Sequence, residues 1–77
     1  MLNFTYAEND ELPHRVIIDD RLHGAGRTKS DAVVAALSVG RKFPSDLRDD
    51  KKAIASYLFW NYEANPGWSE LIHVLEE

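Results

Sequence analysis

Residues 24–36 read GAGRTKSDAVVAA, and this stretch carries the clearest structural signal in the 77-residue sequence. Thr28 and Asp31 have the spacing of a capping box, in which a hydroxyl and a carboxylate three residues later satisfy free amide groups at a helix start. The stretch therefore predicts a helix over residues 29–39, ended by Gly40 as a left-handed C-cap. The glycines before the cap predict a tight turn that leads into this helix. The helix residues expected to face the core are Val33, Ala36 and Leu37.

The chain before this helix carries strand signals. Residues 2–6 alternate apolar and polar side chains, which predicts a half-buried strand with Leu2, Phe4 and Tyr6 inward. Residues 15–18 are rich in β-branched side chains and predict a second strand, so the two form an antiparallel hairpin. A third short strand fits within residues 20–27. The competing interpretation is a helix over residues 12–23, but its apolar residues would not form one stripe.

Two more helices are expected after a break at Phe43-Pro44. Ser45 is suited to be an N-cap, which predicts a helix to about Ala64. The residues expected to be buried by it are Leu47, Ile54, Tyr57, Leu58 and Trp60. Asn65-Pro66 predicts a stop and a new start. Apolar spacing then predicts a third helix that presents Trp68, Leu71, Ile72 and Leu75. The predicted fold is α+β: an N-terminal antiparallel hairpin, with or without a third short strand, followed by three helices on one sheet face.

Length and composition bound the class of protein. We expect one small domain over residues 1–77 with a thin core. The chain has no cysteine, its first residues do not resemble a signal peptide, and no stretch approaches the roughly 18 apolar residues of a membrane span. These features predict a cytoplasmic protein. The net charge is −4, with acidic ends and a basic segment over residues 21–52.

The sequence argues against an enzyme. His14, His23 and His73 are scattered and lack the spacing of a metal site. The serines lack a nucleophile elbow, and Gly24-Ala25-Gly26 is too short to be a phosphate-binding or dinucleotide-binding fingerprint. We therefore expect no enzymatic activity, no cofactor and no metal.

The basic middle segment suggests a nucleic-acid-binding alternative. A glycine-containing segment before a helix start could hold a phosphate on backbone amides. The stretch resembles the end of a double-stranded-RNA-binding domain in Gly24, Gly26, Thr28, Lys29, Ala32, Ala35 and Ala36, and Pro13-His14 resembles a loop of that family. Two further lysines of that family are replaced here by Ser30 and Val33, and the segment from His14 to Gly24 is too short for two full strands. The resemblance implies RNA recognition by shape. The basic residues available for it are Arg27, Lys29, Arg41, Lys42, Lys51 and Lys52.

A second nucleic-acid interpretation is a ribbon-helix-helix dimer that reads bases with Asn3 and Thr5 on its strand. It requires the helix over residues 12–23. The overall acidic charge weighs against both nucleic-acid interpretations, because clustered base drives phosphate binding.

The aromatic residues of the C-terminal part favour protein binding. Phe59 and Trp60 are consecutive, so both cannot face inward on a helix. An exposed aromatic side chain rimmed by charge is a common interface anchor. We therefore expect a non-enzymatic regulator or inhibitor, of a kind encoded by phages and mobile elements, that occupies a partner protein's surface. The expected anchors are Phe59, Trp60 and Trp68, and the acidic residues expected to steer it towards a basic partner are Asp19, Asp20, Glu63 and Glu70. Self-association is the remaining alternative.

Overall fold

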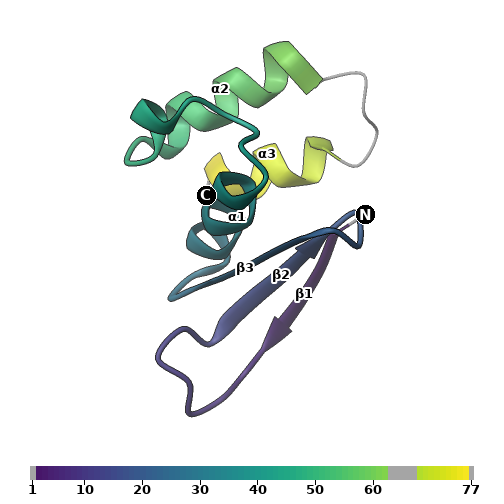
Figure 1. Ribbon diagram of the computed structural model, residues 1–77, viewed down its shortest axis with the longest axis vertical. Helices are drawn as coiled ribbons and strands as arrows, with labels where there is room; N and C mark the ends of the chain where they lie inside the picture. Colours follow the sequence, from purple (N-terminus) through teal and green to yellow (C-terminus); the bar gives the residue numbers. More distant parts are fainter. Residues whose placement is uncertain (1, 63–67, 77) are drawn as a thin grey trace.

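The computed structural model describes residues 2–62 and 68–76, and it shows an α+β fold (Figure 1). In chain order the elements are β1 (Leu2–Tyr6), β2 (His14–Ile18), β3 (Leu22–Gly26), α1 (Lys29–Val39), the short 3-10 helix η1 (Ser45–Leu47), α2 (Lys51–Tyr62) and α3 (Trp68–Glu76). The helices lie on one face of the sheet, as predicted, and the third strand is present. The competing helix over residues 12–23 is wrong, because that segment forms β2, a turn and the start of β3.

The three strands form a simple antiparallel meander in the order β1-β2-β3. The register is uninterrupted: Phe4 lies opposite Val16, and Val16 lies opposite Gly24. The β2–β3 connection has positive φ at Asp19 (52°) and Asp20 (61°). Aspartate tolerates this left-handed conformation better than most residues, which gives the pair a structural role in the turn.

The cap of α1 forms as predicted, but the glycines before it do not form a turn. The Asp31 amide donates a hydrogen bond to the Thr28 hydroxyl oxygen (3.1 Å). Gly24 and Gly26 belong to β3, where α1 packs directly against them. A Cβ added at Gly24 would lie 2.8 Å from the Cβ of Ala36 and still closer to the backbone of α1. The glycines are therefore required for close helix–strand packing.

Two further local predictions need correction. Gly40 has an ordinary right-handed conformation (φ −80°), and Arg41 is the residue with positive φ (53°). The predicted helix starting at Ser45 is divided into η1 and α2. Asp50 lies at this break, and its carboxylate accepts a hydrogen bond from the Ala53 amide (3.1 Å), which caps the start of α2.

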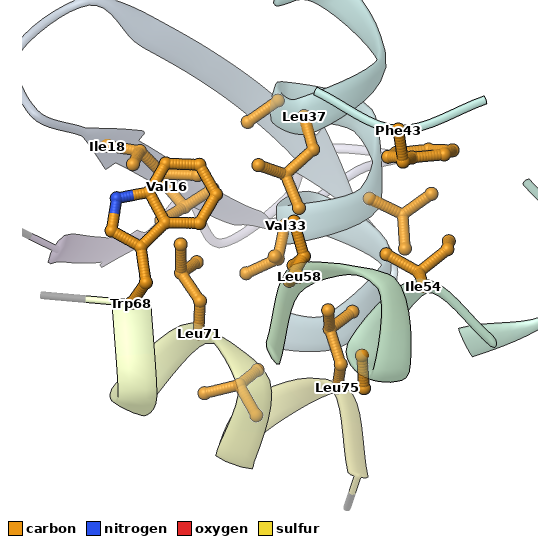
Figure 2. Packing of buried hydrophobic residues seen from close by; sticks show 14 of the residues in the cluster. Val16, Ile18, Val33, Leu37, Phe43, Ile54, Leu58, Trp68, Leu71 and Leu75 are labelled. Carbon is orange, nitrogen blue, oxygen red and sulfur yellow. The ribbon is translucent and has the colours of Figure 1, made fainter. Parts of the chain in front are cut away.

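One hydrophobic core joins the sheet to all three α-helices. Figure 2 shows Trp68 of α3 against Val16 and Ile18 of β2, and Leu58 of α2 beside Val33 of α1. The buried residues are Val16, Ile18, Ala32, Val33, Val34, Ala36, Leu37, Phe43, Ile54, Ala55, Leu58, Trp68, Leu71, Val74 and Leu75. The expected core positions of α1 are confirmed. Two expectations were wrong: Tyr6 is 64% exposed, and Trp60 is 76% exposed.

The glycine contact gives a direct test of this packing. We expect Gly24→Ala to lower the free energy of unfolding by about 2 kcal/mol or more, because the new methyl group would displace α1 from β3. The neighbouring Ala25→Ser, on the opposite side of the strand, should change it by about 0.5 kcal/mol or less. Chemical denaturation followed by circular dichroism measures both. Equal stability of the two variants would contradict the close packing.

Candidate functional site

The exposed aromatic pair on α2 is the most distinctive surface feature of the described residues. Ile54 and Leu58 turn one side of α2 into the core, so the following residues, Phe59 and Trp60, project outward. Phe59 is 47% exposed and Trp60 is 76% exposed. Their rings meet edge to face with centroids 5.5 Å apart. This contact holds two large apolar side chains together on the surface.

A groove between α2 and α3 lies beside this pair. Its volume is about 410 Å³, and Phe59 lines it. Both helices line the groove with apolar and polar side chains: Lys52, Ala55, Ser56, Phe59, Ile72 and Glu76. A lysine and a glutamate therefore flank an apolar surface, which suits an amphipathic segment of another protein. We call these six residues and Trp60 the α2/α3 surface.

The three aromatic residues predicted to anchor a partner lie in two different environments. Phe59 and Trp60 lie on the surface, whereas Trp68 is in the core with 4% of its surface exposed and its ring stacked on Tyr62 (4.7 Å). Trp68 is therefore too buried to act as an anchor for a partner protein. Sequence reasoning missed Ile72 as a groove residue, since its helical spacing placed it in the core.

Three of the four acidic residues predicted to steer a partner lie within the described residues, and these three are exposed. Asp19 and Asp20 form the β2–β3 turn, and Glu70 lies in the first turn of α3. Figure 1 shows this turn and the start of α3 towards the same end of the molecule, and Figure 2 shows Trp68 packed against Ile18, next to the turn. Glu63 lies outside the described residues. Three of the four acidic residues thus lie at one end of the fold.

The basic residues proposed for nucleic-acid binding are dispersed. The Lys51 ammonium forms an ion pair with Asp31 (2.8 Å) and donates a hydrogen bond to the Ser30 hydroxyl (2.8 Å). Lys29 lies over the Phe4 ring, 5.5 Å from its centroid. Lys52 lines the α2/α3 groove. The lysines of the basic segment therefore do not form one basic surface.

Arginines gather more closely than lysines. Arg48 lines one hollow with Arg27 and a second hollow with Arg41. Arg48 was not among the basic residues predicted from the sequence to bind nucleic acid. Lys42 is half-buried after α1. Arg27, Arg41 and Arg48 are therefore the residues that support the nucleic-acid alternative.

The Asp31 carboxylate occupies the first turn of α1. The Lys51 hydrogen bond holds the pKa of Asp31 below its ordinary value of 3.8, and the Thr28 hydroxyl acts in the same direction. Asp31 thus stays ionised in the first turn, where a bound phosphate would otherwise be favoured. This arrangement stabilises the helix and repels an anion at the same place.

Chemistry-bearing side chains are sparse in the described part of the chain. Within residues 2–62 and 68–76, no three histidine, aspartate or glutamate side chains gather as a metal site. His14 packs edge to face on Tyr6 with centroids 5.0 Å apart, whereas His23 lines a hollow on the sheet face opposite the helices. In the same described ranges no helix has both the length and the apolar character needed to cross a bilayer.

Comparison of the chain with protein families, with curated proteins and with solved structures finds no match. The site must therefore be interpreted from its own geometry.

The Asp31–Lys51 pair predicts a specific pH dependence. Because the folded pKa of Asp31 is lowered, its contribution to stability is present above the ordinary value of 3.8 and is lost as pH falls through the folded pKa. We expect Lys51→Met to raise the Asp31 pKa and to cost about 1 kcal/mol or less at neutral pH, since the pair is partly exposed. The stability difference from the natural protein should shrink below about pH 4.

NMR titration of the Asp31 carboxyl and denaturation at several pH values measure these effects. Lys52→Met removes the same charge one residue away, at a position that lines the α2/α3 groove, and is the matched control. An equal change of the Asp31 pKa in both variants would show that the direct pair is not the cause.

Proposed function

We propose that this chain is a small, non-enzymatic, cytoplasmic protein-binding regulator or inhibitor that acts by occupying a partner's surface. The observation that carries the proposal is the Phe59–Trp60 pair, which stands exposed beside a partly apolar groove. A small domain has little apolar surface to spare, so leaving two large aromatic side chains outside the core needs a reason.

The α2/α3 surface has the composition of an interface centre. Large aromatic side chains contribute most of the binding energy at many protein interfaces, since each can bury about 150–250 Å². Phe59 and Trp60 support each other, so little side-chain freedom is lost when a partner covers them. An apolar segment of the partner would enter the groove, with Lys52 and Glu76 pairing at its flanks.

Electrostatics favour a basic partner. The chain carries a net charge of −4, and Asp19, Asp20 and Glu70 are exposed near one end of the fold. Such a field raises the association rate with a positively charged target and contributes less to the lifetime of the complex. A partner that itself binds nucleic acid would meet this description, and the acidic end would then compete with phosphate.

The nucleic-acid alternative retains one observation in its favour, the arrangement of Arg27, Arg41 and Arg48 along two adjoining hollows. The two functions differ in their response to salt. Phosphate binding weakens steeply as salt rises, because each neutralised phosphate releases counterions. Binding through Phe59 and Trp60 depends on apolar burial, so its affinity should change little over the same range.

The decisive variant is Trp60→Ala. We expect it to weaken partner binding by about 30-fold or more, which corresponds to an anchor worth about 2 kcal/mol. Its unfolding free energy should change by about 0.5 kcal/mol or less, since the side chain is exposed. Val39→Ala is the matched control, because Val39 is also an exposed apolar residue, at 73%, but lies on α1.

The measurement is a tagged pull-down from lysate with and without nuclease, followed by titration of the captured partner against each variant. A partner that survives nuclease and is lost with Trp60→Ala supports the proposal. Retention of that partner by Trp60→Ala would contradict it, and loss of all partners after nuclease treatment would favour the arginine hollows.

A further inference from the structure

We infer that β1 is a dimerisation edge, through which a second copy of this chain adds its own β1 in the antiparallel direction. β1 and β3 are the two edges of the sheet. Sheet edges are usually protected from such pairing by charged side chains, proline or a bulge. The β1 residues Leu2–Tyr6, with the sequence LNFTY, have no charge and no proline, and the β1–β2 register continues without a bulge.

The backbone of β1 directs three residues towards open solvent. The Ala7 amide donates a hydrogen bond to the Pro13 carbonyl (2.7 Å), which continues the β1–β2 register as a hydrogen-bonded pair. Such pairs alternate along an antiparallel ladder, so Thr5 and Asn3 also face β2. The N–H and C=O groups of the intervening residues, Leu2, Phe4 and Tyr6, therefore point away from the sheet.

The β3 edge is less suited to pairing with a second copy. The Arg21 amide donates to the Ile18 carbonyl (3.1 Å) at the β2–β3 turn, which makes Ile18 and Leu22 the hydrogen-bonded pair that begins this ladder. By the same alternation, β3 directs its free groups outward at His23 and Ala25. Arg21 and Arg27 flank that strand with charge, as protected edges are. The two edge strands are equally long, but β1 has three residues with outward backbone groups where β3 has two, and it is less protected by charge.

The sequence of β1 is complementary to itself in the antiparallel direction. A two-fold axis through Phe4 places Phe4 opposite Phe4 of the second copy, and Leu2 opposite Tyr6. These three positions are the ones with outward backbone groups, so each pair can exchange both of its hydrogen bonds. Asn3 then lies opposite Thr5. Each facing pair is uncharged, so the symmetric arrangement brings no like charges together within the strand.

The side chains at this edge are left half covered by the monomer. Leu2 and Phe4 face the helical layer but are only partly buried, and Tyr6 is 64% exposed. In Figure 1, β1 is the strand farthest from α1. Pairing of two β1 strands would join these side chains into one apolar row across the seam. On the helical side of the sheet, the Lys29 ammonium lies over the Phe4 ring and can remain there.

The charge-swap experiment tests both the seam and its register. The natural protein is expected to sediment as a concentration-dependent dimer. Asn3→Lys with Thr5→Lys places lysines opposite lysines across the seam, and both side chains are exposed in the monomer. We expect the dimer dissociation constant to rise about tenfold or more without loss of folding. Asn3→Glu with Thr5→Glu should behave alike, and an equal mixture of the two variants should recover a mixed dimer.

His23→Lys is the control, because it adds a lysine to the same outer sheet face but at the β3 edge. Sedimentation equilibrium at increasing concentration provides the readout. A natural protein that stays monomeric up to millimolar concentration, or a dimer that both charged variants leave unchanged, would overturn the inference. Neither outcome depends on the α2/α3 surface, so the proposed function stands or fails separately.

Discussion

The close approach of α1 to β3 is the constraint on which the rest of the structure depends. Gly24 and Gly26 have no side chain on the helix side, and the backbone of α1 occupies the space that a Cβ would fill. Ala32 and Ala36 are correspondingly small and fully buried. Small residues on both elements allow the backbones of α1 and β3 to approach each other closely. Thr28 caps the helix shortly after Gly26, so the chain passes directly from β3 into α1.

This contact also decides which surfaces stay open. α1 lies over β3 and β2, and the Trp68 side chain of α3 also packs against β2 (Figure 2). α2 packs on α3 and α1, farther from the sheet, so one of its sides faces solvent (Figure 1). The aromatic pair projects from that side, and β1 remains at the edge least covered by helices. Both proposed interfaces thus follow from where α1 is placed.

The sequence was informative wherever a local pattern determined the outcome. The cap at Thr28, the alternation in β1 and the apolar spacing of α3 each predicted the element that forms. Local patterns could not show that Gly24 and Gly26 belong to a strand, because the need for glycine there comes from a helix that follows later in the chain. The division of the predicted second helix also depends on a local competition, in which the Asp50 side chain captures the Ala53 amide.

The candidate site was predictable in part for a similar reason. Helical geometry alone shows that the consecutive residues Phe59 and Trp60 cannot both face the core, so the exposure of at least one could be inferred. It did not show that both are exposed, and Trp60 was wrongly expected to be buried. The choice between Trp60 and Trp68 could not be inferred, since both are tryptophans at apolar positions of helices. The structure separates them by tertiary contact: Trp68 meets the sheet and Tyr62, whereas Trp60 meets Phe59 on the outside. The positions of the lysines could not be predicted either, because Lys51 pairs with Asp31 and Lys29 lies over Phe4, and both contacts join different elements.

The two proposed interfaces are geometrically compatible. When antiparallel strands of two copies form one continuous sheet, the two-fold axis runs perpendicular to that sheet. Both helical layers, and with them the two α2/α3 surfaces, then lie on the same side of the joined sheet. A partner with two matching segments, or a partner that is itself two-fold symmetric, would meet both surfaces at once. The second contact would then form at a high effective concentration, which raises affinity without adding residues to a small interface.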